Sequence, residues 1–318
     1  MRFLFLLLMT TPVWAQVTVQ EYPVPKGHTI HDVWADAAPN GPVYFSAQGS
    51  GHLGILDPKS GKVEFVALGR GSSPHGVIAG PDGAVWLTDG GQNAIVRVDP
   101  RIEPKTHAVK LWKLPEDSGY TNLNTAIFDR QGIHWFTGQS GIYGRLDPRS
   151  GEIKLFDAPK GRGPYGIHAT PDGTVYYASL AGSFVGKINP DGSTTVIEPP
   201  TRRQGARRVW SDSQGNVWVA EWNSGNLSRY EPKTGKWSTW RAPGDEPRVY
   251  AVYVDPADKV WVSEWSAQAM LRFDPQTEKF ESFRSSSRTA NVRQIHGRRG
   301  EVWTPESAAD KLVVYRYK

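Results

Sequence analysis

A short aromatic motif recurs seven times along the chain and constrains the fold more than any other feature. The segment 85–89 (Val-Trp-Leu-Thr-Asp) is one copy, and the others vary around it. The copies end at Gln48, Asp89, Gly138, Ser179, Glu221, Glu264 and Glu306, between 41 and 49 residues apart. A period of about 40–50 residues built of short strands and turns is typical of a β-propeller. Seven copies predict seven blades.

Each repeat contains the sequence signals of four strands. An alternating stretch is followed by a turn such as Gly-Pro-Asp-Gly at 80–83, then by the aromatic strand, a third strand and a more polar fourth. The last repeat ends after its third strand, at 311–317, and the orphan stretch 17–23 reads as the missing fourth strand. Pairing the two would remove two open sheet edges. We therefore predict an all-β fold, a single seven-bladed domain over residues 16–318, closed by its N-terminal strand.

The first fifteen residues have the composition of a signal peptide. Arg2 precedes an apolar run at 3–9, and small residues around Ala15 predict cleavage before Gln16. This predicts a periplasmic or secreted protein. No apolar run is long enough to cross a bilayer.

Composition excludes several kinds of site. The chain has no cysteine, which rules out disulfides, thiolate nucleophiles, cysteine-zinc sites and attached c-type haem. Its net charge of +5 comes from scattered basic residues, which argues against nucleic-acid binding.

Two positions in each repeat are predicted to lie beside the ring axis. One ends the aromatic strand, as given above. The other begins the innermost strand and is occupied in turn by His31, His75, Asn124, Tyr165, Arg207, Tyr250 and Arg293. Carboxylates, guanidiniums, imidazoles and phenols gathered in a concave channel favour a ligand site over packing alone. The alternative is that these groups only bond to one another around a water-filled channel.

The repeats resemble those of the virginiamycin B lyases, also called streptogramin lyases. The resemblance rests on the segments 74–77, 80–89 and 93–98, and on Glu-Trp-Asn-Ser-Gly-Asn at 221–226 and Tyr-Gly-Arg-Leu at 143–146. It implies a seven-bladed propeller that opens the ester bond of a cyclic depsipeptide by Mg²⁺-assisted elimination. It also implies a catalytic His on the inner strand of each of the last two blades and a Glu after the aromatic strand of the last.

The implied catalytic residues are only partly present. Glu306 fits the acidic position, but Tyr250 and Arg293 stand where the two His residues are expected. An Arg stays protonated and cannot act as a general base near neutral pH.

Two other adjacent blades do offer His at the inner position, namely His31 and His75, with Asp89 fourteen residues after the second. Because the blades are related by pseudo-symmetry, His31, His75 and Asp89 are arranged similarly to the two His residues and one Glu that the resemblance implies, but two blades further along the ring. We therefore predict His31, His75 and Glu306 as catalytic, with imidazole as the general base. Asp89, Glu221 and Glu264 are predicted to hold a divalent cation, Mg²⁺ by resemblance. The alternative for each His is a turn-capping role.

The remaining polar and aromatic positions predict a substrate site. Two Arg side chains suit an anion, and tryptophans that follow ring Glu residues could stack on a flat ligand. The predicted set is Tyr165, Arg207, Trp222, Tyr250, Trp265 and Arg293. The alternative for this arc is a salt-bridged network.

Three functions remain open from the sequence. The first is a metal-assisted lyase that cleaves an ester or lactone C–O bond at the channel, on a small-molecule or cyclic-peptide ligand. The second is a propeller that binds a ligand or protein without chemistry. The third, a gluconolactonase-like calcium hydrolase, ranks last because that class usually has six blades. Nothing in the sequence demands more than a monomer.

Overall fold

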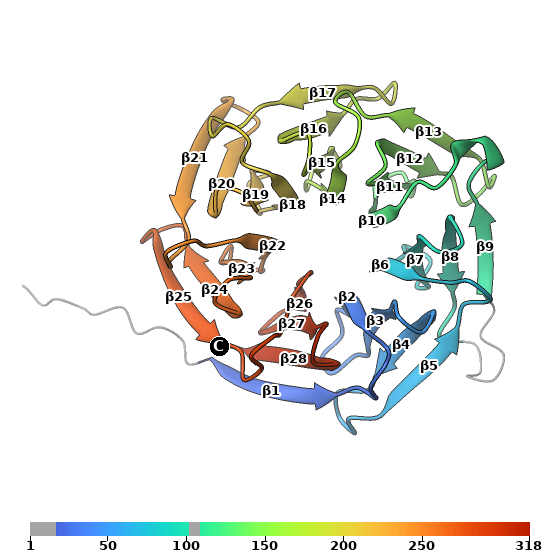
Figure 1. Ribbon diagram of the computed structural model, residues 1–318, viewed down its shortest axis with the longest axis horizontal. Helices are drawn as coiled ribbons and strands as arrows, with labels where there is room; N and C mark the ends of the chain where they lie inside the picture. The colour runs from blue at the N-terminus through green and yellow to red at the C-terminus, as the bar shows by residue number, and fades with distance from the viewer. Residues whose placement is uncertain (1–16, 102–108) are drawn as a thin grey trace, which may run out of the picture.

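The computed structural model describes residues 17–101 and 109–318. In this part of the chain, seven four-stranded antiparallel sheets stand around a central axis (Figure 1). The predicted seven-bladed propeller is thereby confirmed. The predicted signal peptide, residues 1–15, and its cleavage site lie outside the described residues.

Successive strands of a blade run from the axis to the rim. The innermost strands are β2 (Ile30–Ala35), β6 (Pro74–Ala79), β10 (Leu123–Phe128), β14 (Pro164–Ala169), β18 (Ala206–Ser211), β22 (Val249–Val254) and β26 (His296–Arg298). The second strands carry the aromatic motif and are β3 (Val43–Ala47), β7 (Val85–Asp89), β11 (His134–Gly138), β15 (Val175–Ser179), β19 (Val217–Glu221), β23 (Val260–Glu264) and β27 (Glu301–Glu306). The third strands are β4 (His52–Leu56), β8 (Ala94–Val98), β12 (Ile142–Leu146), β16 (Phe184–Ile188), β20 (Asn226–Glu231), β24 (Ala269–Asp274) and β28 (Lys311–Arg316). The outer strands are β5 (Val63–Ala67), β9 (Val109–Lys113), β13 (Ile153–Asp157), β17 (Thr194–Ile197), β21 (Lys236–Arg241), β25 (Lys279–Arg284) and β1 (Thr18–Pro23).

The N-terminal strand closes the ring, as predicted. β1 pairs antiparallel with β28 in a register that runs from Thr18 opposite Arg316 to Pro23 opposite Lys311. Tyr22 anchors the junction, because its ring packs against Trp303 at 5.4 Å and its hydroxyl donates to the carbonyl of Pro58, 3.0 Å away. One strand therefore ties the seventh blade to the first.

Tryptophans of the second strands fill the space between blades. Trp86, Trp218, Trp261 and Trp303 are fully buried, and each indole N–H donates to a carboxylate of its own blade. A buried indole with a satisfied N–H supplies a large apolar contact without an unpaired donor. These residues belong to the packing of the ring.

A β-bulge near the start of the innermost strand is the feature that builds the channel. The pairing register shifts there in β2, β6, β10, β14, β18 and β22. A bulge sets two residues opposite one on the partner strand and re-aims their side chains.

Hydroxyl groups lock these bulges to the next blade. Ser46 accepts the N–H of Asp32 and donates to the carbonyl of His75 at 2.6 Å. Thr88 and Thr137 repeat the pattern, accepting from Gly76 and Thr125 and donating to the carbonyls of Asn124 and Tyr165. We call each such hydroxyl, with its two hydrogen bonds, a hydroxyl clip. Each clip fixes the backbone of an axial residue in the following blade.

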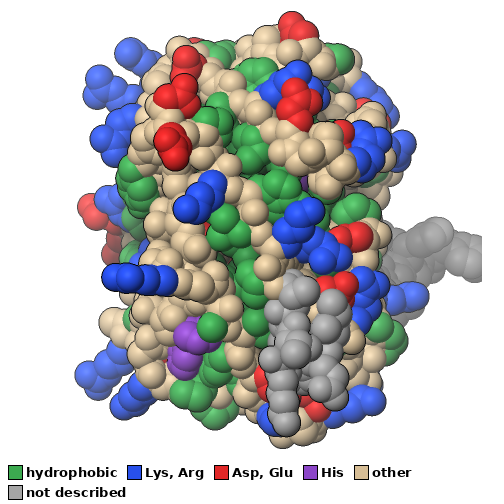
Figure 2. Space-filling view, turned by 90° about the vertical axis from the view of Figure 1, so that its right-hand side faces the viewer, with side chains coloured by type: hydrophobic (Ala, Val, Ile, Leu, Met, Phe, Trp, Pro, Cys, Tyr) green, Lys and Arg blue, Asp and Glu red, His purple; other side chains and the backbone are tan. Residues whose placement is uncertain are grey.

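The only helix among the described residues is the 3-10 turn η1 (Glu116–Ser118), so none of their helices could cross a membrane. On the side of the ring that Figure 2 shows, Lys and Arg side chains are interspersed with acidic and apolar ones.

We expect deletion of residues 17–25 to expose the edge of β28 and to remove the Tyr22 contacts. The shortened protein should aggregate or lose about 10 °C or more in Tm. Thermal unfolding followed by circular dichroism checks this, with a chain beginning at Gln16 as the control. Equal Tm values for the two proteins would show that the pairing of β1 with β28 does not stabilise the ring.

Buried histidines should make the fold sensitive to acid. Burial lowers the pKa of His134 and of His296 to about 3, from an ordinary value of 6.5. Below pH 6.5 the unfolded chain therefore takes up protons that the folded chain does not, and stability falls as the pH drops toward 3.

The His134→Leu variant isolates this effect, because His134 is surrounded by aromatic rings and neither of its ring nitrogens has a partner. The loss of unfolding free energy between pH 6.5 and 4.5 should be about 2 kcal/mol smaller in the variant. Urea unfolding at both pH values measures it, and comparison at pH 7 controls for altered packing. An equal acid loss in parent and variant would contradict the assignment.

Candidate functional site

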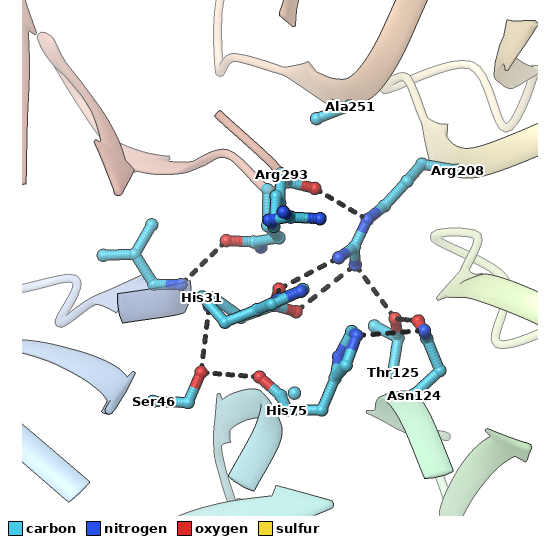
Figure 3. A network of polar contacts seen from close by, with 12 residues as sticks. His31, Ser46, His75, Asn124, Thr125, Arg208, Ala251 and Arg293 are labelled. Carbon is cyan, nitrogen blue, oxygen red and sulfur yellow. Dashed lines mark hydrogen bonds and ion pairs between the residues drawn. The ribbon is translucent and has the colours of Figure 1, made fainter. Parts of the chain in front are cut away.

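A buried ion pair crosses the centre of the channel. Arg208, from the bulge of β18, reaches Asp32, from the bulge of β2, with nitrogen–oxygen distances of 2.9 and 3.3 Å (Figure 3). Arg208 also donates to the hydroxyl of Thr125 at 2.9 Å and to the carbonyl of Arg293 at 3.1 Å. A single guanidinium thus joins four blades.

Gly166 makes room for this arginine. A Cβ at that position would lie 2.7 Å from the Cα of Arg208, closer than side-chain carbons approach in real structures. The bulge of β14 therefore carries no second side chain toward the axis, and blades four and five can approach closely.

His31 and His75 lie together beside the ion pair, with ring centroids 3.9 Å apart. The Nδ1 of His31 is 2.8 Å from Asp32 Oδ1. Because a carboxylate only accepts hydrogen bonds, Nδ1 carries the proton and Nε2 keeps its lone pair. Asp32 thereby orients His31 as the carboxylate of a catalytic dyad does.

His75 has the same tautomer, but it is the other ring nitrogen that lacks a partner in the protein. Its Nε2 is 3.1 Å from the amide nitrogen of Asn124, and the amide oxygen of Asn124 accepts from Thr125 at 2.6 Å. This chain of contacts makes Nε2 the acceptor and leaves the proton on Nδ1, which has no partner in the protein. His75 therefore offers an N–H donor, whereas His31 offers a lone pair.

Both imidazoles are held in the neutral form. Burial lowers the pKa of His31 well below its usual value, and the charges of Arg208, Arg293 and Arg207 lower it further. Burial likewise lowers the pKa of His75, and His31, Arg208 and Arg293 lower it further, while the charge of Asp32 acts in the opposite direction.

Two phenols continue the ring of axial groups. The hydroxyls of Tyr165 and Tyr250 are 2.5 Å apart, and Arg207 Nη2 is 3.2 Å from the Tyr165 oxygen. Burial acts to raise the pKa of Tyr165, but the charges of Arg207 and Arg208 and the hydrogen bonds outweigh it, and the pKa is lowered. Burial raises the pKa of Tyr250 to about 12.

Arginine and aromatic side chains alternate next to the phenols. The guanidinium of Arg207 lies over the rings of Tyr250 and Trp222, 3.5 and 4.4 Å from their centroids. Trp265 stacks on Tyr250 at 5.2 Å, and Arg293 lies over Trp265 at 5.1 Å. The structure therefore brings together the whole set predicted for substrate binding.

The carboxylates predicted as metal ligands do not gather with one another. Asp89 accepts hydrogen bonds from its own blade, including the side chains of Ser72 and Gln92 and three backbone N–H groups. Glu221 bonds to the side chains of Ser224, Asn226 and Ser228. Glu264 accepts the backbone N–H groups of Arg248, Ser266 and Ala267. Each carboxylate caps loops at the end of its strand.

Glu306, predicted as catalytic, is also in a local network. It is 1% exposed, accepts from Ser285 at 2.5 Å and lies 3.3 Å from the ammonium of Lys311. Among the other ends of second strands, Gln48 is half-buried and Ser179 is buried with no partner for its hydroxyl.

One group of side chains could hold a metal ion. Ligand atoms of His31, Asp32 and His75 lie within 4.8 Å of one another, and no other group of three or more His or acidic residues does so in the described part of the chain. Two members of this buried group, His31 and His75, were predicted as site residues.

Sequence reasoning missed Asp32 and Arg208, the two residues on which the centre depends. Both follow directly after a predicted axial residue, and only the bulge turns two consecutive side chains inward. The signal that could have found them is a pair of adjacent polar residues at the start of an inner strand, His-Asp at 31–32 and Arg-Arg at 207–208.

Aromatic rings line the channel beyond the ion pair, around a cavity that Asp32, Arg208, Trp34, His168 and Trp210 border. Trp34 stacks on His296 at 3.7 Å, His168 stacks on Trp210 at 3.9 Å, and Trp210 lies edge-on to Tyr253 at 5.0 Å. Arg207, Arg293, Trp222 and Trp265 form a second group of axial side chains and are also partly exposed.

Comparison with known proteins places this ring of residues in context. Three solved structures share the fold over 95% of the chain: virginiamycin B lyase of Staphylococcus aureus (TM-score 0.85, 18% identity, 100% of that chain), a streptogramin B lyase (0.85, 19%, 98%) and a catalytically inactive variant of the S. aureus enzyme with quinupristin (0.84, 19%, 100%). A gluconolactonase of Zymomonas mobilis subsp. mobilis is 29% identical over 146 residues, 40% of this chain and 39% of that protein. The chain thus spans about two fifths of the length of that curated relative.

The family assignment rests on sequence as well as on fold. Residues 11–240 match the virginiamycin B lyase family, which is more than half of the chain. The chain belongs to the virginiamycin B lyase family.

Proposed function

We propose that this protein cleaves an ester or lactone C–O bond by elimination, with His31 as the general base. The observation that supports this most directly is the His31–Asp32 pair, in which the carboxylate fixes the tautomer and leaves Nε2 able to accept a proton. Membership of a family named for a C–O lyase supports the reaction class.

The proposed reaction balances with groups that this chain supplies. His31 Nε2 removes the proton on the carbon next to a carbonyl, and the electron pair forms a carbon–carbon double bond. The bond from the adjacent carbon to the ester oxygen breaks, and the acyl group leaves as a carboxylate. Arg207 and Arg293 stabilise the developing negative charge as fixed cations, and the Nδ1–H of His75 is an additional donor.

Mg²⁺ does not fit the residues at this centre. Mg²⁺ prefers six oxygen ligands, whereas the group at His31, Asp32 and His75 offers two imidazoles and one carboxylate. That carboxylate is already engaged by Arg208, and the charges of Arg207 and Arg293 also act on the site. We therefore propose a reaction in which guanidinium groups provide the positive charge, and we derive no step through a metal.

The same dyad also suits hydrolysis. If His31 activates water instead of removing a carbon-bound proton, the product of a lactone is a hydroxy acid. The partial similarity to a gluconolactonase favours this as the second candidate. Product analysis separates the two, since only elimination creates a double bond.

We further propose that the protein acts as a monomer outside the cytoplasm, in the periplasm or as a secreted protein, on a small-molecule or cyclic-peptide ligand. The signal-peptide pattern at 1–15 supports the location, and partial exposure of Arg207, Trp222, Trp265 and Arg293 supports access by such a ligand.

Substitution of the dyad should abolish turnover without unfolding the ring. His31→Gln keeps a donor toward Asp32 and removes the base, and we expect kcat to fall by about 10²–10⁴-fold. Assays on a cyclic depsipeptide and a panel of lactones, followed by ultraviolet absorbance of the new double bond, measure this.

Glu306→Gln is the informative companion variant. It should lower Tm by weakening the contacts to Ser285 and Lys311, with turnover retained at a temperature where it is folded. A larger loss of turnover in Glu306→Gln than in His31→Gln would place the chemistry at the last blade. Absence of turnover on every substrate would favour a binding propeller without chemistry.

Removal of divalent metals should leave turnover unchanged within about twofold. Because the proposed positive charge is covalently part of the chain, dialysis against EDTA removes nothing that the reaction needs. Rates before EDTA, after EDTA and after addition of Mg²⁺ are compared, with metal content measured by mass spectrometry. Loss of activity on EDTA with recovery on Mg²⁺ would overturn the guanidinium assignment.

A further inference from the structure

Two arginines at the accessible end of the channel have no acidic partner. Asp32 pairs with Arg208, and neither Arg207 nor Arg293 forms an ion pair with any carboxylate among the described residues. The Nε of Arg207 is buried and has no hydrogen-bond acceptor. A buried donor on a charged group without a partner is costly, which points to a ligand atom that satisfies it.

The groups around these arginines add no compensating charge. His31 and His75 are neutral, and Tyr165 contacts Arg207 through its hydroxyl oxygen. With three guanidiniums and one carboxylate, the centre carries a net positive charge. Such a site attracts anions and repels cations.

Aromatic rings hold the arginines by their faces. Arg207 lies against Tyr250 and Trp222, and Arg293 lies over Trp265. A guanidinium stacked in this way keeps its N–H edges free for a carboxylate.

Trp222 and Trp265 also differ from the fully buried tryptophans of the second strands. They are partly exposed and lie edge to face at 5.7 Å. Arg207 and Arg248 lie over Trp222, and Tyr250 and Arg293 lie over Trp265. The exposed parts of these indoles offer apolar contact to a flat group next to the cationic edges.

We infer that the substrate is itself an organic anion, a carboxylate that carries a flat apolar group. The carboxylate binds between Arg207 and Arg293, and the flat group packs on Trp222 and Trp265. This inference deepens the proposed function and rests on it in one respect. Recognition of an anion follows from the arginines alone. The choice of a carboxylate over a phosphate ester rests on the proposed reaction, in which the carbonyl next to the deprotonated carbon is that of the bound carboxylate, so the same two arginines hold the substrate and stabilise the charge that develops on it.

Binding of small matched probes to the full chain tests the inference without requiring turnover. Phenylacetate, phenylacetamide and phenethylammonium differ mainly in charge, and phenyl phosphate supplies the competing anion. Isothermal titration calorimetry should show phenylacetate binding at least tenfold more tightly than the amide, and no binding of the ammonium. The affinity for phenylacetate should fall as NaCl is raised, because a charge-based contact is screened.

Charge-removing variants locate the contact. Arg207→Gln and Arg293→Gln should each weaken phenylacetate binding at least tenfold while leaving phenylacetamide unaffected. Arg299→Gln removes the same charge from an exposed position after β26 and should bind phenylacetate as the parent does. Melting temperatures show whether each variant is folded. If a variant does not fold, the comparison of probes and of salt concentrations on the parent protein still tests the inference.

The outcomes separate this inference from the proposed function. Equal binding of phenylacetate and phenylacetamide, or no binding of any probe, overturns the inference even if esters are cleaved. Tighter binding of phenyl phosphate than of phenylacetate overturns the choice of a carboxylate. Selective, arginine-dependent binding of phenylacetate without turnover on any ester or lactone supports the inference and removes the proposed reaction.

Discussion

The hydroxyl clips between neighbouring blades are the interaction on which the centre of this molecule depends. In three successive blades, a Ser or Thr of the second strand accepts from the bulge of its own inner strand and donates to an axial carbonyl of the next. The clips hold His75, Asn124 and Tyr165 by their backbone. The position of the backbone sets the direction of each side chain. The bulge therefore recurs from blade to blade and directs functional side chains toward the axis.

The ion pair of Asp32 and Arg208 shows why the centre is polar although it is buried. Two charges taken out of water are stable only when both are paired and further hydrogen-bonded, and here Thr125 and the carbonyl of Arg293 complete the set. The carboxylate of the pair also orients His31. A single contact thus serves both the stability of four blades and the tautomer of one imidazole.

The architecture was predictable because the period is strong and each copy repeats the same strand and turn chemistry. The gathering of His31, His75, Tyr165, Arg207 and Arg293 was also predictable, since equivalent positions in a ring face one axis. Predicted axial carboxylates such as Asp89 and Glu264 instead bond into loops, because the last residue of the second strand lies where the chain turns away. Asp32 and Arg208 escaped prediction because a strict alternation directs every second residue outward, and only three-dimensional pairing reveals the bulge.

Closure of the ring by β1 has a consequence for how the protein must be made. The first of the described strands pairs with the last of them, and Tyr22 contacts Arg316 across 294 residues of chain. Six blades can each form from a contiguous segment, but the seventh exists only when both ends are present. A chain that stops short of β28 therefore keeps an unpaired strand at its start and open edges on its sheets, a state that cellular quality control can tell from the finished ring.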